Sequence, residues 1–153
     1  MANIIQTKYD ARAVMTITLA NKGTGVAQQS TLIDNTSLNR PGALIFLRWR
    51  SGSSTPTAGT TVGVYLIRKD GTNATDNAGT TDAVITIENA PLLGSIVVTN
   101  TTGKDFWGEF DTGILGPLSG TWGIAVRNNT GTTSDTTGGN FVLAYQTYYP
   151  EVQ

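Results

Sequence analysis

The 153-residue sequence contains neither cysteine nor histidine. Without cysteine, the chain has no disulfide, no thiolate metal site and no cysteine nucleophile. Without histidine, it lacks the usual general base of enzymes and the commonest metal ligand of proteins. These absences disfavour catalysis, so we expect a protein that is not an enzyme and that has no catalytic residue, no bound metal and no cofactor.

Charge and long apolar runs are scarce as well. Charged residues make up 14% of the chain, against about 25% in ordinary soluble domains, and the net charge is only -1. The chain therefore lacks the basic footprint of nucleic-acid-binding proteins. No run approaches the roughly 20 apolar residues of a membrane helix, and the first residues, MANIIQTKYDAR, contain no apolar stretch of signal-peptide length. We expect a chain that is made in a cytoplasm and binds neither nucleic acid nor a membrane.

Short apolar runs recur along the chain, each followed by a stretch rich in Gly, Thr, Asn or Ser. Apolar and polar residues alternate within the runs, which is the pattern of strands that bury one face. In ALIFLRWR, for example, alternation places Ile45, Leu47 and Trp49 on the core side and Arg48 and Arg50 on the other. The runs that predict strands are residues 13–20, 30–34, 43–50, 60–71, 82–88, 94–100, 104–111, 121–128 and 140–149.

This series of runs predicts an all-β fold. Eight or nine antiparallel strands without helices most often form two packed sheets, so we expect an antiparallel two-sheet β-sandwich, with the jelly roll as the favoured topology. An immunoglobulin-like sandwich is the alternative, although its Cys…Trp…Cys pattern is missing. The runs predict a single β-sandwich domain over residues 13–153, preceded by an N-terminal arm over residues 1–12.

The segment DFWGEFDTG, residues 105–113, combines three carboxylates with three aromatic side chains. Strand alternation turns Phe106 and Phe110 towards the core and Trp107, Glu109 and Asp111 towards the other face. Glu109 and Asp111 would then lie about 6.5–7 Å apart, at the edge of the separation used by inverting glycosidases. Any two carboxylates two residues apart on a strand share this spacing, and a solvated face does not raise a carboxyl pKa. We therefore interpret the segment as a solvated strand face with an exposed Trp107, not as an active site.

Two other groups of side chains suggest a surface for a partner. In FLRWRSG, Arg48 and Arg50 share one face, and arginine is enriched at protein interfaces. A protein interface is favoured over nucleic acid because the chain is slightly acidic, while pairing with carboxylates on a neighbouring strand or subunit is the structural alternative. At the C-terminus, Tyr148 and Tyr149 lie on opposite faces of the last predicted strand and are suited to an interface or to stacking on sugars.

Three aspartates, Asp70, Asp76 and Asp82, follow one another through the loop sequence DGTNATDNAGTTD. Loop carboxylates of this kind can bind calcium. The spacing matches no calcium-binding loop, because the EF-hand pattern needs ligands at alternating positions and a closing glutamate. A turn-rich loop is therefore favoured, and no metal site is predicted here.

Residues 90–149 carry an ordered set of motifs. A strand ends in an FDTG turn at residues 110–113, a Pro-Leu corner follows at residues 117–118, a W-G-I-x-V strand occupies residues 122–126, and a tyrosine-rich strand closes the segment at residues 141–149. In this order the motifs resemble those of small virion proteins of tailed bacteriophages. The profile of the whole chain also resembles jelly-roll decoration (cement) proteins, which sit on phage heads.

This resemblance implies a structural virion protein that is made in the host cytoplasm, binds the major capsid protein on the outer head surface and stabilises the shell as a homo-oligomer, with a trimer favoured. It also implies that the arm over residues 1–12 extends onto a neighbouring subunit or the shell and becomes ordered on binding. The alternative is a receptor- or glycan-binding module of a phage fibre or spike, with Trp107, Tyr148 and Tyr149 as its first candidates. The expected partner-binding residues are Ile4, Ile5, Tyr9, Arg48, Arg50, Trp107, Tyr148 and Tyr149.

Overall fold

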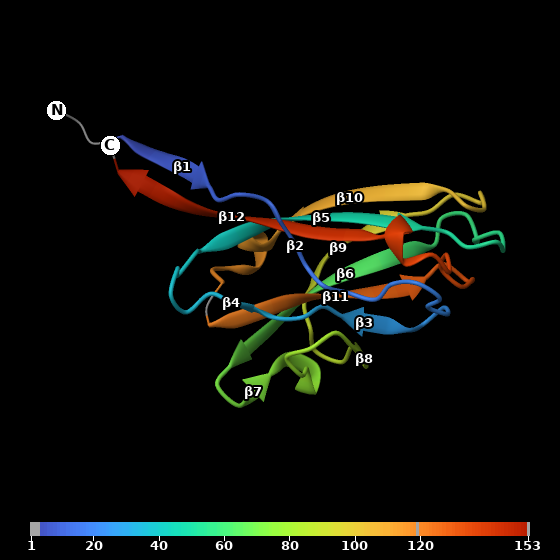
Figure 1. The fold of residues 1–153 in the computed structure, drawn as a ribbon, viewed down its shortest axis with the longest axis horizontal. Helices are drawn as coiled ribbons and strands as arrows, with labels where there is room; N and C mark the ends of the chain where they lie inside the picture. The colour runs from blue at the N-terminus through green and yellow to red at the C-terminus, as the bar shows by residue number, and fades with distance from the viewer. Residues whose placement is uncertain (1–3, 119, 153) are drawn as a thin grey trace.

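Residues 4–118 and 120–152 are described by the computed structural model of the chain. They form two antiparallel sheets that pack face to face (Figure 1). Sheet A consists of β1 (Ile5–Tyr9), β2 (Ala13–Val14), β5 (Gly42–Arg50), β10 (Asp105–Asp111) and β12 (Val142–Val152). Sheet B consists of β3 (Ala27–Gln29), β4 (Ile33–Asp34), β6 (Thr61–Asp70), β7 (Asn73–Ala74), β8 (Ala83–Ile85), β9 (Leu92–Val97) and β11 (Thr121–Asn129).

Three short 3-10 helices lie in the connections between strands: η1 (Thr75–Asn77), η2 (Thr112–Leu115) and η3 (Gly138–Asn140). The helix η2 follows β10 directly and begins where the Asp111 carboxylate accepts a hydrogen bond of 2.8 Å from the Gly113 N–H. Nowhere in residues 4–118 and 120–152 does a helix have both the length and the apolar character that crossing a membrane requires.

The order of the strands is that of a jelly roll. Sheet A runs β1, β12, β5, β10, with β2 beside β12 on the side of β1, and the main part of sheet B runs from β3 and β4 through β11 and β6 to β9. We count β1 with β2 as one interrupted strand and β3 with β4 as another. Numbered 1 to 8 along the chain, the main strands then lie in the order 1-8-3-6 in sheet A and 2-7-4-5 in sheet B. This is the double-sheet jelly roll. The predicted fold class is confirmed, and β7 and β8 are short additions to sheet B.

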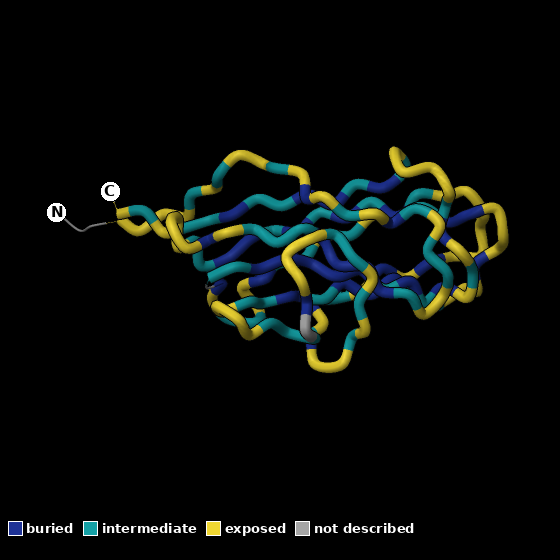
Figure 2. The backbone as a smooth tube through the Cα atoms, turned by 60° about the horizontal axis from the view of Figure 1, so that its bottom comes forward, coloured by how far each residue is buried: buried dark blue, intermediate teal, exposed yellow. Residues whose placement is uncertain are grey.

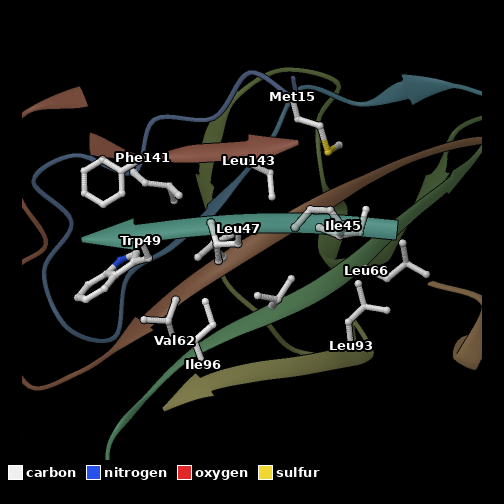
Figure 3. Close-up of a cluster of buried hydrophobic side chains, with 14 of the residues drawn as sticks. Met15, Ile45, Leu47, Trp49, Val62, Leu66, Leu93, Ile96, Phe141 and Leu143 are labelled. Atoms are coloured by element: carbon white, nitrogen blue, oxygen red, sulfur yellow. The ribbon is translucent and has the colours of Figure 1, made fainter. Parts of the chain in front are cut away.

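The hydrophobic core lies between the two sheets. Sheet A contributes Ile45, Leu47 and Trp49 of β5, which are at most 1% exposed. Figure 3 shows these side chains in one cluster with residues of β6, β9 and β12, among them Val62, Leu66, Leu93, Ile96 and Leu143. The alternation of β5 therefore buries the side chains that the sequence predicts and leaves Arg48 and Arg50 on the outer face.

The outer faces of the two sheets differ in their cover. Over sheet B, the segments on either side of β8 pack onto the sheet, where Ala78 and Ala90 form a second apolar cluster with Ile67 of β6 and Ala125 of β11. Asp76 joins these segments, because its carboxylate accepts the backbone N–H groups of residues 88, 89 and 90 at 3.1, 2.6 and 3.0 Å. The described residues place no comparable apolar cluster over the outer face of sheet A. Sheet A is thus the sheet with an open outer face.

The predicted strand over residues 13–20 is wrong in its extent. Only Ala13–Val14 pairs with β12. Met15 is buried, as the alternation predicts, but the chain then leaves sheet A, and Thr16 already accepts a backbone hydrogen bond of 2.9 Å from Thr31. Burial alternates here without a strand ladder because the segment passes from sheet A to sheet B and still buries Met15 and Leu19 in the core.

Candidate functional site

The two ends of the chain form a ribbon that projects from the sandwich (Figure 1). β5 begins at Gly42, opposite Tyr148, so the rest of β12 pairs only with β1. We call residues 5–9 and 148–152 the terminal ribbon. Its side chains are largely open to solvent (Figure 2), with Ile5 70% and Val152 62% exposed. The ribbon therefore exposes apolar side chains on two strands that extend beyond the packed sheets.

The predicted N-terminal arm contains a strand of sheet A. Its residues Ile5–Tyr9 already pair with β12 as β1, and Lys8 forms an ion pair of 3.2 Å with Glu151. Ile4, also expected to bind a partner, lies just before β1 and is exposed. Residues 1–3 of the arm lie outside the described residues. Residues 5–9 of the arm thus form an edge strand of sheet A.

One side of the ribbon's base is held by Asp10. Its carboxylate accepts hydrogen bonds from Arg40 Nε at 2.7 Å, Arg40 Nη2 at 2.9 Å and the Thr147 hydroxyl at 2.6 Å. The hydrogen bond from Thr147, helped by Arg40, lowers the pKa of Asp10 although partial burial opposes the shift. The Arg40 guanidinium carbon also lies 3.7 Å from the centre of the Tyr149 ring. The Tyr149 ring thus packs against Arg40 of the same chain.

The other side of the base is held by Tyr148. Its ring meets the Tyr9 ring edge-on, with the centres 6.0 Å apart. The side chain lies across Gly42 of β5, and its hydroxyl donates a hydrogen bond of 2.8 Å to the Asp111 carboxylate at the end of β10. Tyr148 therefore ties the ribbon to the far strand of sheet A and fixes the direction in which the ribbon projects.

We expect the contact between Tyr148 and Asp111 to make stability sensitive to alkaline pH. Burial, together with the hydrogen bond to the Asp111 carboxylate, raises the pKa of Tyr148 to about 12. In the unfolded chain the phenol ionises near its ordinary pKa of about 10. The stabilising effect of this group is therefore complete below about pH 10 and is lost as the pH rises towards about 12. Urea unfolding at about pH 9 and pH 11 should show a larger loss for the wild type than for Tyr148→Phe, and equal losses would contradict the assignment.

The outer face of sheet A contains a shallow hollow beside Trp107. The hollow has a volume of about 220 Å³ and is lined by Arg12, Phe46, Trp107, Gly108 and Glu109. The Arg12 guanidinium carbon lies 4.2 Å from the centre of the Phe46 ring. Trp107 is 63% exposed, and Phe106 on the same strand is buried, as the alternation predicts. The hollow thus combines an exposed indole with one cation and one carboxylate.

The two arginines of β5 have different surroundings. Arg50 is paired with Asp105 of β10 at 3.1 Å and with Asp135 at 3.6 Å, so the pairing with a neighbouring strand considered above holds for Arg50. Arg48 instead donates to the backbone carbonyls of residues 139 and 140 and lies 5.6 Å from the Trp107 ring centre. Among the described residues, Arg48 has no carboxylate within ion-pair distance. Of the two, Arg48 has the charge available to a partner.

Strand register brings most of the expected partner-binding residues onto one face. Directly opposed residues of a sheet share a face, and the register opposes Trp107 to Arg48 and Tyr148 to Tyr9. The residues on this face are Ile5, Tyr9, Arg48, Arg50, Trp107 and Tyr148. Tyr149 points to the opposite face, and Ile4 precedes the strand. The sequence did not single out Arg12 or Phe46, because Arg12 falls in the predicted arm and Phe46 is one apolar residue within the predicted strand over residues 43–50.

Three of the carboxylates singled out in the sequence, Asp76, Asp82 and Asp111, accept hydrogen bonds within the fold. Asp111 accepts hydrogen bonds from Tyr148 and Gly113, whereas Glu109 is exposed in the hollow. Asp76 binds backbone N–H groups, and Asp82 accepts hydrogen bonds from Thr18 and Gln28. Across residues 4–118 and 120–152, no three acidic side chains gather in a way that would hold a metal ion.

No protein-family model and no curated protein matches this sequence. The function is therefore inferred from the outer face of sheet A and from the terminal ribbon, together with the motif order of residues 90–149.

Proposed function

We propose that the chain is a structural protein of a bacteriophage virion, a decoration protein that binds the major capsid protein on the outside of the head and stabilises the shell. The observation that carries the proposal is the difference between the two sheets. The segments on either side of β8 cover part of the outer face of sheet B, whereas the outer face of sheet A is open. It holds exposed Trp107 and Arg48, which forms no ion pair with any described residue. Aromatic residues and arginine are the residue types enriched in protein interfaces.

The shape of this face also supports attachment to a large surface. A protein that ties capsid subunits together needs a broad contact, and the outer face of sheet A together with the terminal ribbon supplies one. The terminal ribbon extends the same face beyond the sandwich and adds exposed Ile5 and Val152. A contact of about 1,200–2,000 Å² suffices for specific binding, and many repeated contacts on a shell multiply its effect. The resemblance favours a trimer at threefold or quasi-threefold positions of the shell.

Glycan or receptor binding at the hollow beside Trp107 is the second candidate function. An exposed indole next to the Glu109 carboxylate and the Arg12 guanidinium is suited to stack on a sugar ring and to bind its hydroxyl groups. The other two aromatic candidates do not converge on the hollow, because Tyr148 is bound to Asp111 and Tyr149 lies against Arg40. The decoration role is therefore the better supported of the two.

Add-back to phage heads tests the proposal. Heads are produced from a phage in which the gene for this chain has been deleted, and the purified protein is then added. We expect the wild type to bind and to raise the temperature at which the heads break open. The double variant Trp107→Ala/Arg48→Ala should bind at least tenfold more weakly, because it removes the exposed indole and the available charge. Val84→Ala is the matched control, since Val84 is 62% exposed but belongs to sheet B.

Three outcomes would count against the decoration role. The first is absence of the chain from wild-type particles, and the second is failure of the protein to bind heads that lack it. The third is that Val84→Ala binds as weakly as Trp107→Ala/Arg48→Ala. Binding to host cells, with none to heads and with dependence on Trp107, would favour the second candidate function.

A further inference from the structure

The terminal ribbon has an unpaired edge along β1. In sheet A the strand order ends at β1, and no described strand pairs with its outer side. An edge of this kind presents free backbone N–H and C=O groups to any strand that can approach it. Natural edge strands are often protected by a lysine. Here, however, Lys8 is drawn to Glu151 within the ribbon, at 3.2 Å.

The hydrogen-bond pattern shows which groups of β1 point outwards. The Asp10 N–H donates to the Thr147 carbonyl at 2.9 Å, so these opposed residues form a hydrogen-bonded pair. Such pairs alternate along an antiparallel ladder, and the register therefore makes Lys8 with Tyr149, and Gln6 with Glu151, the next bonded pairs. The backbone groups of Ile5, Thr7 and Tyr9 consequently point away from β12, towards solvent.

The opposite edge of the ribbon is less suited to accept a strand. On β12 the outward-pointing backbone groups beyond Gly42 belong to Pro150 and Val152, because these residues alternate with Tyr149 and Glu151. Proline has no N–H group and cannot donate to a ladder. The ribbon therefore offers one good edge for strand addition, and that edge is β1.

We propose that β1 pairs with β1 of a second copy of this chain, antiparallel and centred on Thr7. Only this register opposes all three outward-pointing residues: Ile5 to Tyr9 of the partner subunit, Thr7 to Thr7 of the partner subunit, and Tyr9 to Ile5 of the partner subunit. Since each such pair exchanges two hydrogen bonds, the three pairs make six. Registers shifted by two residues keep fewer pairs.

Side chains and charges fit the same register. On one face, Ile5 meets an aromatic ring at each end of the contact, a pairing of the kind that stabilises sheets. On the other face, Lys8 lies opposite Gln6 of the partner subunit, so that no two like charges are opposed. The result is a continuous four-stranded sheet whose apolar face includes Tyr148 and Val152 from both copies. The axis is twofold, so this contact is separate from any threefold contact and would join two trimers if trimers form.

Cysteine cross-linking tests the register directly, because the natural chain has no cysteine. Across a hydrogen-bonded pair the two Thr7 Cα atoms lie about 5.5 Å apart, within the range of about 4.4–6.8 Å that a disulfide spans. Gln6→Cys is the matched control, since Gln6 is also exposed on β1 but its counterpart lies diagonally, at about 7–8 Å or more. Under mild oxidation we expect Thr7→Cys to form a covalent dimer at least tenfold faster than Gln6→Cys.

A second variant measures the contact without cross-linking. Thr7→Pro removes one outward N–H group that the pairing of β1 with β12 does not use, and edge strands tolerate proline at such positions. By light scattering over a hundredfold range of concentration, Thr7→Pro should dissociate at a concentration at least tenfold higher than Thr7→Val, which keeps the N–H group. Equal cross-linking of the two cysteine variants, no cross-linking of either, or an unchanged mass for Thr7→Pro would each overturn the proposal. These measurements use the isolated chain, so a negative result would leave the test on phage heads standing.

Discussion

Replacing Gly42 with alanine is expected to lower the free energy of unfolding by about 2–4 kcal/mol and to loosen the terminal ribbon. A Cβ atom at this position would collide with the ring and the hydroxyl of Tyr148, which lies across the glycine. The ring would have to turn outwards, and its hydrogen bond of 2.8 Å to Asp111 would break. The variant would thus separate the ribbon from β10 without changing any polar side chain.

Urea unfolding and an alkaline titration together measure this effect. Displacement of the ring should return the pKa of Tyr148 from about 12 towards that of an ordinary tyrosine, which a general loss of stability would not do. Gly23→Ala is the matched control, because a Cβ atom there meets nothing within 4 Å. Its stability should be unchanged or higher by up to about 1 kcal/mol. Similar results for the two variants would show that Gly42 is not needed for the position of Tyr148.

The side-chain faces of the central strands could be predicted because alternation is a local property. In β10 and β5 every second residue faces the core, so Phe106, Trp49 and the exposed Trp107 all lie where the sequence predicts. The same rule failed for residues 13–20, where the side chains alternate but the backbone bonds to two different sheets. Alternation of apolar and polar residues predicts which side chains are buried. It does not predict backbone pairing, because a strand ladder also needs a neighbouring strand in register. The strand β3 (Ala27–Gln29) was missed for the converse reason, since AQQ shows no alternation although all three residues are buried.

The candidate site depends on contacts between residues far apart in the sequence, which no local pattern predicts. IQTKY was assigned to an arm because its partner strand lies at the other end of the chain. The opposite faces of Tyr148 and Tyr149 followed from alternation, but the bond from Tyr148 to Asp111 requires three strands in register and a residue without a side chain at position 42. Composition thus indicated which residue types a partner surface would use, whereas the tertiary fold determined which of them gather.

Replacing Asp10 with alanine is expected to lower the free energy of unfolding at neutral pH by about 1.5–3 kcal/mol. The Asp10 carboxylate accepts hydrogen bonds from Arg40 and Thr147 at the base of the ribbon, and its removal leaves both donors without their acceptor. The effect should depend on pH. Because the folded chain lowers the pKa of Asp10, the stabilisation is complete above the ordinary carboxyl pKa of about 3.9 and is lost as the pH falls through the lower folded value.

Wild type and Asp10→Ala should therefore differ most near pH 7 and converge in acid, as measured by urea unfolding at several pH values. Glu88→Ala removes an exposed carboxylate that forms no ion pair with any described residue, and it should match the wild type throughout. A difference that stayed constant down to about pH 2 would mean that Asp10 acts through packing and not through its charge.

Loss of the Asp10 contacts also removes one of the two attachments that hold the base of the ribbon. In Asp10→Ala the cross-linking of Thr7→Cys should therefore slow even where the sandwich remains folded. Unchanged cross-linking would show that β1 recognises its partner without a fixed base.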